Sequence, residues 1–131
     1  MRIYCCGVFD LAHYGHFEFL KKVAEHGELI VGIHSDKDCE NYKRVPILNE
    51  NERALTLTYL SFVKKIIVGA PLVTTSEFLE KNNLDLVAIP EEYADGKGSW
   101  YDQILSKGNY VIIGRTEGIS TTQIINKAKK Y

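Results

Sequence analysis

The sequence has few cysteines, no long hydrophobic run and a net charge close to zero. Its three cysteines, Cys5, Cys6 and Cys39, do not form a disulfide framework and leave an odd thiol, so we expect a reducing compartment and a cytoplasmic protein. No apolar run approaches the roughly 20 residues that cross a bilayer, and no signal-peptide pattern is visible. A net charge of −1 argues against nucleic acid and against a membrane surface as partners.

What the chain does have is a regular alternation of short apolar runs with longer amphipathic stretches. Residues 1–131, 45% hydrophobic and 25% charged, are expected to form one domain with a buried core. The alternation is typical of an α/β fold, and we predict a single Rossmann-like domain with a five-stranded parallel sheet and helices on both faces. The predicted strands are 2–6, 28–33, 65–68, 84–89 and 110–113.

Helical spacing of the remaining apolar residues predicts the helices that connect the strands. They cover 17–24, 50–62, 76–81 and 120–129. Gly27 stands where a C-cap glycine would end the first helix, Asn49 is the candidate N-cap of the second, and a threonine pair opens the third. The segment 90–98 is expected to be a loop. Open α/β sheets bind ligands outside the carboxyl ends of their strands, so the loops there are the place to look for chemistry.

The loop after the first predicted strand brings two histidines to the start of a helix. Gly7 lets the backbone approach a ligand, and His13 and His16, three residues apart, share one face of the first turn. Imidazoles at a helix N-terminus add donors for the oxygens of a triphosphate or its pentacovalent transition state, and Gly15 keeps side-chain bulk away. Two alternatives stay open. In the first, the two residues are ordinary surface histidines. In the second, they bind a metal together with Cys6; because further ligands at a recognisable spacing are missing, no metal site is predicted.

A second strand-to-helix turn, residues 114–122, follows the last predicted strand. Arg115 can bind phosphate in a bidentate manner, and the hydroxyl and N–H groups of the next helix start can hold phosphate oxygens. The hydroxyl residues are Ser120, Thr121 and Thr122. Taken alone, these three residues favour an ordinary helix N-cap. The arginine and glycines before them favour a second anion-binding turn that faces the first.

Together the two turns resemble those of the cytidylyltransferase family. The pattern Gly-x-Phe-Asp-x-x-His-x-Gly-His spans 7–16 and Arg-Thr-Glu-Gly-Ile-Ser-Thr-Thr spans 115–122. The first is shared with adenylyltransferases and, loosely, with class I aminoacyl-tRNA synthetases, whereas the second is more specific. Segments 47–53 and 70–75 resemble stretches of the choline-phosphate and ethanolamine-phosphate enzymes, so the likeness covers nearly the whole chain. The length is similar to that of bacterial glycerol-3-phosphate cytidylyltransferases.

The resemblance implies a nucleotidyltransferase-type fold and a CTP-dependent enzyme. A phosphate oxygen of a small phosphorylated alcohol would attack the α-phosphorus of CTP in line, and pyrophosphate would leave without a covalent enzyme intermediate. Glycerol 3-phosphate is the first choice of acceptor, giving CDP-glycerol, with ethanolamine phosphate (giving CDP-ethanolamine) or choline phosphate as alternatives. Mg²⁺ is carried with CTP, and a homodimer is implied. An adenylyltransferase, a non-catalytic nucleotide-binding module and a small thiol or metal protein remain alternatives.

The resemblance also assigns roles to individual residues. His13 and His16 would stabilise the transferring and leaving phosphates, Lys43 would bridge the acceptor phosphate and the α-phosphate, and Arg115 completes the catalytic set. Asp10 would order the phosphate loop. The nucleotide-binding set is Gly7, Val8, Phe9, Asp10, Gly15, His16, Arg115, Thr116, Gly118, Ile119, Ser120, Thr121 and Thr122. The candidates for acceptor binding are Lys43, Glu91, Glu92, Tyr93 and Trp100, together with Tyr101.

Several positions depart from the pattern of the family. Cys6 replaces the carboxylate that choline-phosphate enzymes carry before the first glycine, and Leu72 replaces their tryptophan. Residues 89–92, Ile-Pro-Glu-Glu, replace the family's His-Gly-Asp-Asp. Residues 63–66, Val-Lys-Lys-Ile, replace its Val-Asp-Glu-Val stretch near the dimer contact. An aromatic cage with a carboxylate is what holds a quaternary ammonium. Because most of it is absent from these positions, glycerol 3-phosphate is placed first.

Overall fold

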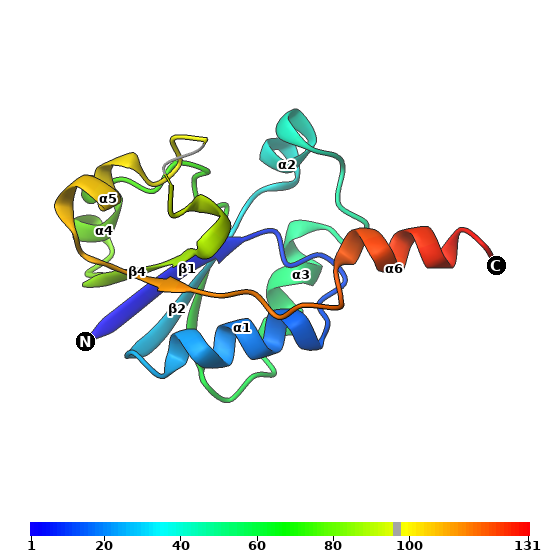
Figure 1. Cartoon of the computed structure of the whole chain (residues 1–131), viewed down its shortest axis with the longest axis horizontal. Coiled ribbons are helices and arrows are strands. Elements are labelled where there is room, and N and C mark those ends of the chain that lie inside the picture. Colours follow the sequence, from blue (N-terminus) through cyan, green and yellow to red (C-terminus); the bar gives the residue numbers. More distant parts are fainter. Residues whose placement is uncertain (96–97) are drawn as a thin grey trace.

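The computed structural model describes residues 1–95 and 98–131, which form one α/β domain (Figure 1). Its elements, in chain order, are β1 (Arg2–Gly7), α1 (Tyr14–Ala24), β2 (Glu28–Ile33), α2 (Asp36–Tyr42), α3 (Glu50–Leu57), β3 (Val63–Val68), α4 (Ser76–Lys81), β4 (Leu86–Pro90), η1 (Glu91–Tyr93), α5 (Asp102–Lys107), β5 (Tyr110–Ile113) and α6 (Thr121–Ala128). None of the helices in these ranges combines the length and apolar character that a bilayer crossing requires.

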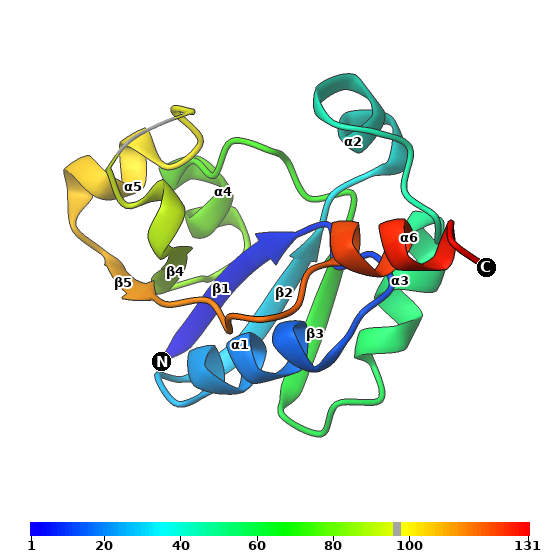
Figure 2. The ribbon, with the colours of Figure 1, turned by 45° about the vertical axis from the view of Figure 1, so that its right-hand side comes forward.

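The sheet confirms the predicted architecture. Its five strands are parallel and stand in the order β3-β2-β1-β4-β5, so β1 and β4, far apart in sequence, are neighbours at the point where the strand order reverses. Figure 2 shows β1, β2 and β3 side by side. β1 pairs with β2 as far as Gly7 but with β4 only as far as Tyr4. The two central strands therefore separate toward their carboxyl ends, which is where ligands of such sheets bind.

Helices cover both faces of the sheet, as predicted. One core cluster joins Ile3 and Cys5 of β1 to α1 and α3, and the other joins Tyr4 to α4 and α5. Successive side chains of a strand point to opposite faces, so these neighbours in β1 belong to different cores. α6 has no buried residue and projects beyond the sheet in Figure 1.

Two predictions about helix ends need correction. The helix predicted over 50–62 is α3, Glu50–Leu57; the chain turns after it, and Leu60 and Phe62 reach the core from that turn. Asn49 is its N-cap, as predicted. Gly27 is not a helix cap, since α1 ends at Ala24; a Cβ there would lie 2.6 Å from the carbonyl oxygen of Met1, and close backbone packing is what requires glycine.

Two helices and one short turn were missed by the sequence pattern. α2 and α5 are short and mostly polar, so they carry little apolar periodicity, and α2 is recognisable only by its N-cap Ser35. The segment 90–98 is not a plain loop: Pro90 ends β4 and residues 91–93 form the 3₁₀ turn η1. Residues 96–97 of that segment lie outside the described residues.

Candidate functional site

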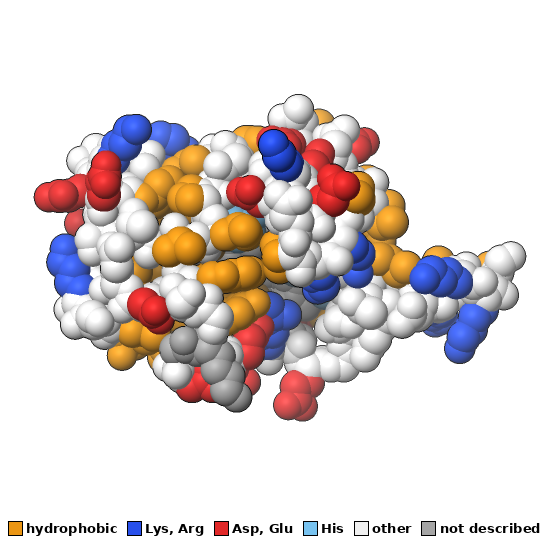
Figure 3. Space-filling view, turned by 90° about the horizontal axis from the view of Figure 1, so that it is seen from above, with side chains coloured by type: hydrophobic (Ala, Val, Ile, Leu, Met, Phe, Trp, Pro, Cys, Tyr) orange, Lys and Arg blue, Asp and Glu red, His pale blue; other side chains and the backbone are white. Residues whose placement is uncertain are grey.

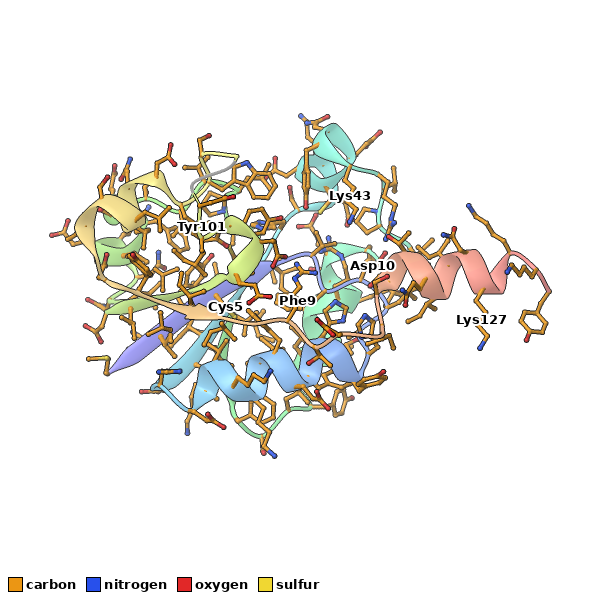
Figure 4. The ribbon with its side chains drawn as sticks, in the orientation of Figure 1. Cys5, Phe9, Asp10, Lys43, Tyr101 and Lys127 are labelled. Atoms are coloured by element: carbon orange, nitrogen blue, oxygen red, sulfur yellow. The ribbon has the colours of Figure 1, made fainter. Side chains whose placement is uncertain are left out.

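A pocket opens at the carboxyl ends of the strands and brings the two predicted turns together. Its lining includes these predicted site residues: Gly7, Val8, Phe9, Asp10, His13, Gly15, His16, Lys43, Tyr93, Trp100, Tyr101, Arg115, Thr116, Ile119, Ser120, Thr121 and Thr122. Gly118, Glu91 and Glu92 are not part of this lining. Figure 4 shows Lys43 at the end of α2 and Asp10 beside the start of α6, whereas Lys127 lies on the far part of α6. No cluster of three or more His, Cys, Asp or Glu side chains suited to a metal ion occurs in the described ranges.

The two histidines cap α1 and lie against each other. His13 is the N-cap residue, and the centres of the His13 and His16 rings are 3.9 Å apart. The N–H of Gly15 donates to His13 Nδ1 over 3.1 Å, and the N–H of His13 donates to His16 Nδ1 over 3.2 Å. In a neutral ring that accepts through Nδ1, the proton is on Nε2. Both histidines therefore hold an Nε2–H donor in a fixed orientation, and Nε2 of His13 is buried without a partner among the described residues.

Burial disfavours the charged form of both rings in the free protein. Burial lowers the pKa of His13. Burial, and then the neighbouring charges of His13 and Arg115, lower the pKa of His16 to about 4, against the opposing influence of Asp10. A bound polyphosphate would reverse part of this shift, because an adjacent negative charge favours the imidazolium form.

The second turn is joined to the first by direct contacts. Thr121 Oγ1 donates to the backbone carbonyl of Asp10 over 2.8 Å. A Cβ on Gly15 would come within 2.9 Å of Ile119 Cγ2, so glycine allows the two turns to pack together. Ser120 is the N-cap of α6, with Oγ accepting from the N–H of Gln123 over 3.1 Å. The N-cap interpretation therefore holds for Ser120, and it leaves the start of α6 facing the pocket.

Two buried charged residues hold the loops around these turns. Asp10, 2% exposed, accepts from the N–H groups of Ile47 over 2.7 Å and Leu48 over 2.9 Å, so it anchors the segment before α3. Arg53, 0% exposed, donates to the carbonyls of Val8, Leu48 and His34 and to the Asp36 carboxylate. Sequence reasoning gave Arg53 no role, although a single arginine among the apolar residues of a short helix could have marked it as an anchor.

The other end of the pocket is aromatic. The rings of Tyr42 and Trp100 meet edge to face with centres 5.0 Å apart, and Tyr93 stacks on Trp100 with centres 5.7 Å apart. Tyr101 tilts against Tyr93 at 5.8 Å. Figure 3 shows hydrophobic side chains gathered between α5 and α2, with charged side chains around them. We call this part, made of Cys6, His34, Tyr42, Tyr93, Trp100 and Tyr101, the aromatic end, and the part around the histidine pair and the start of α6 the phosphate end.

Comparison with known proteins agrees with this geometry. The sequence model of the family described as cytidylyltransferase-like matches residues 4–127. The chain belongs to this family. It is 36% identical to the ethanolamine-phosphate cytidylyltransferase of Dictyostelium discoideum over 97% of this chain and 36% of that protein. It is 39% identical to the choline-phosphate cytidylyltransferase of Saccharomyces cerevisiae over 97% of this chain and 31% of that protein. The chain thus spans about a third of the length of these two relatives.

A solved structure supports the fold as well. The lipopolysaccharide core biosynthesis protein from Thermoplasma volcanium GSS1 superposes with a TM-score of 0.71. The alignment covers 91% of this chain and 98% of that chain at 24% identity. At this identity the likeness concerns the fold alone. Together with the family match it confirms the Rossmann-like prediction and the resemblance to cytidylyltransferases.

The residues predicted to bind the acceptor fall into two groups, those that line the pocket and those that do not. Tyr93 and Trp100 line the pocket, whereas Glu92 forms an ion pair with Arg115 and does not line it. Glu91 lies behind the turn after β5, where its Oε2 would be 3.4 Å from a Cβ on Gly114. Neither glutamate lines the pocket in this structure, so their contact with an acceptor stays a prediction.

Sequence reasoning missed His34 and Tyr42. Both line the pocket, His34 directly after β2 and Tyr42 at the end of α2. The position of His34 at the carboxyl end of a predicted strand was the available signal. For Tyr42 there was none, because α2 itself was not predicted.

Proposed function

We propose that this chain transfers CMP from CTP to a small phosphorylated alcohol and releases pyrophosphate. One observation carries the proposal: the starts of α1 and α6 and the histidine pair face one pocket, and the Thr121–Asp10 hydrogen bond fixes the two turns relative to each other. Two positive helix ends with directed N–H donors form a site for a polyphosphate. The names of the relatives supply the reaction class, and the nucleotide motif is nearly complete here.

In this proposal the protein catalyses by positioning and charge stabilisation. An oxygen of the acceptor phosphate attacks the α-phosphorus, and the bond to the pyrophosphate oxygen breaks on the opposite side. The Nε2–H groups of His13 and His16 donate to the oxygens on which negative charge increases. Arg115, more than half exposed and paired at the rim with the carboxylate of Glu92, can turn toward the leaving pyrophosphate.

Lys43 and Mg²⁺ complete the proposed charge balance. Lys43 follows α2 and lines the pocket, where it can contact the acceptor phosphate and the α-phosphate together. Asp10 also lines the pocket, but both its oxygens already accept backbone N–H groups. We therefore propose that Mg²⁺ enters with CTP, held by triphosphate oxygens and water.

The aromatic end of the pocket indicates which kind of acceptor fits there. Its four aromatic side chains, Tyr42, Tyr93, Trp100 and Tyr101, provide ring faces for a cation, which an amine acceptor carries and glycerol 3-phosphate does not. These residues come from other positions than those the family pattern suggested. We propose that ethanolamine phosphate or choline phosphate is the preferred acceptor and that glycerol 3-phosphate, placed first by chain length, is second.

A direct assay tests the proposal. The protein is incubated with CTP and Mg²⁺ and one of the three acceptors, and pyrophosphate release and the CDP-alcohol are measured. We expect product with an amine acceptor above the acceptor-free control. Release of pyrophosphate from ATP but not from CTP would replace the proposal with adenylyl transfer, and nucleotide binding without turnover would replace it with a binding module.

A further inference from the structure

The three cysteines have different surroundings. Cys5 and Cys6 are adjacent in β1, yet Cys5 joins the core under α1 and α3 while Cys6 points to the other face, where β1 has separated from β4. Cys5 is 1% exposed and Cys39 is 2% exposed. Cys6 is partly exposed and lines the aromatic end of the pocket. Of the three cysteines, Cys6 alone is partly exposed and lies among polar side chains.

Two hydroxyl groups lie within hydrogen-bond distance of the Cys6 sulfur, and His34 lies in the same part of the pocket. Sγ lies 3.5 Å from the hydroxyl oxygen of Tyr101 and 3.8 Å from Oγ1 of Thr74, both of which are buried residues. His34 lines the same pocket, and its backbone N–H donates to the carbonyl of Gly7, the residue after Cys6, over 3.1 Å. His34 Nδ1 lies 3.0 Å from the carbonyl oxygen of Ala70, and since a carbonyl only accepts, Nδ1 carries a proton. Nε2 is then the nitrogen that can take the proton of the thiol.

The surroundings shift the pKa values of Cys6 and His34 toward each other. Burial by itself raises the pKa of Cys6, but the hydrogen bond and charge of His34, with Tyr101 and Thr74, outweigh it and lower the pKa. Burial by itself lowers the pKa of His34, but Cys6, the Ala70 carbonyl and Asp38 of α2 outweigh it and raise the pKa. The other titratable groups near the sulfur are Tyr4 and Cys5 of β1, Tyr42 of α2 and Tyr93 of η1.

The pKa values of the other two cysteines are shifted in the opposite direction, upward. Burial, and next the charge of Cys6, raise the pKa of Cys5 well above its usual value. Burial also raises the pKa of Cys39, and Arg53 opposes this only in part. The thiolate is the nucleophilic form, so the chain contains one activated thiol and two internal controls.

We propose that Cys6 and His34 form a thiolate–imidazolium pair, and that Cys6 is a modification site at which hydroperoxides oxidise the protein and close the aromatic end of the pocket. The thiolate attacks one peroxide oxygen, an S–O bond forms and the O–O bond breaks. The leaving hydroxide, or the alkoxide of an organic hydroperoxide, takes the proton of the His34 imidazolium and departs as water or as an alcohol. Sulfur is oxidised to a sulfenic acid and the peroxide is reduced. The loss of acceptor binding rests on the proposed function, whereas the oxidation does not.

Alkylation of the folded protein tests the pair. Iodoacetamide is applied over a range of pH, and the three cysteines are compared by peptide mass spectrometry. At neutral pH we expect Cys6 to react at least about 10-fold faster than Cys39, with a pH midpoint below the value of about 8.5 for a free thiol. A midpoint at or above that value, or equal rates for Cys6 and Cys39, would overturn the proposal without any variant.

Variants identify the partner. His34→Gln should slow the alkylation of Cys6 at neutral pH by about 10-fold and move its midpoint upward, because the thiolate loses its cation. His26→Gln, a change at an exposed histidine, should leave both unchanged. If His34→Gln does not fold, Tyr101→Phe removes one hydroxyl donor and should give a smaller shift in the same direction. An unchanged midpoint in each folded variant contradicts the pairing.

Peroxide treatment tests the modification itself. Hydrogen peroxide followed by dimedone should label Cys6 and neither Cys5 nor Cys39, and Cys6→Ser should take up no label. Oxidised protein should lose CMP transfer, and dithiothreitol should restore it, while Cys6→Ser should keep most of its own activity in peroxide. Labelled Cys6 in a protein without transferase activity would contradict the proposed function alone. Transferase activity with unlabelled Cys6 would overturn the inference alone.

Discussion

The phosphate end and the aromatic end of the pocket differ in how the chain builds them. The phosphate end comes from two short segments, 7–16 and 114–122, in which a helix start and its capping side chains lie within a few residues of one another. The aromatic end takes its residues from β1, the end of β2, α2, η1 and the segment before α5. Local hydrogen bonding makes the first readable from a motif, whereas the second exists only when distant segments pack together.

The two ends also differ in what fixes their side chains. At the phosphate end, backbone N–H groups orient His13 and His16 within one helical turn. At the aromatic end, ring contacts across the chain position Tyr42 and Trp100, which are far apart in sequence. We therefore expect changes at the phosphate end to affect the chemical step, and changes at the aromatic end to affect the choice and affinity of the acceptor. The following predictions test this division.

The largest effect is expected for His16→Ala. Removing a fixed donor to the transition state should lower the rate of CMP transfer about 100- to 1,000-fold, with the far-ultraviolet circular dichroism unchanged. His26→Ala removes an exposed histidine and should keep the full rate. Equal rates for the two variants would mean that the histidine pair is only a helix cap.

Asp10→Asn should affect the stability on which the phosphate end depends. The amide can accept only one of the two N–H groups of Ile47 and Leu48, so the free energy of unfolding in urea should fall by about 1–3 kcal/mol. Asp85→Asn is the matched control, because this exposed carboxylate also accepts a backbone N–H, that of Arg2. If both variants lost the same stability, the burial of Asp10 would not be the cause.

Trp100→Ala tests the aromatic end. Loss of this ring should raise the KM for an amine acceptor about 5-fold, since a cation over a ring contributes roughly 1 kcal/mol, and should leave the KM for CTP unchanged. Tyr59→Ala, at a ring that is 82% exposed, should change neither constant. A rise in the KM for CTP would show that the two ends are not separable.

The smallest expected effect is the uptake of a proton when CTP binds. Bound triphosphate should raise the pKa of His16 from about 4, so CTP binding near pH 6 should take up a fraction of a proton. Calorimetry in two buffers with different ionisation enthalpies measures this number, and comparison with His16→Ala removes the contribution of the nucleotide itself. The same uptake in the variant would contradict the assignment to His16.

Part of the fold and site could be predicted because it depends on nearest neighbours along the chain. The strands, the N-cap Asn49 and the role of Ser120 at the start of α6 follow from periodicity and capping. α2 was missed because its burial is limited to Cys39, and the end of α3 was placed too late because Leu60 continues the apolar pattern through a turn. A sequence shows no direction for a side chain, so the assignment of the two glutamates before Tyr93 to the acceptor stays a prediction.

The sequence by itself determined the sheet, the two strand-to-helix turns and the family. Each of these is encoded in residues within about one helical turn or one strand, where spacing fixes geometry. Only the tertiary structure decided that Arg53 holds three loops, that aromatic rings from separate elements meet, and that Cys6 lies beside His34 while Cys5 does not. These depend on the strand order and on where β1 and β4 separate, and such contacts between distant residues leave no trace in local spacing.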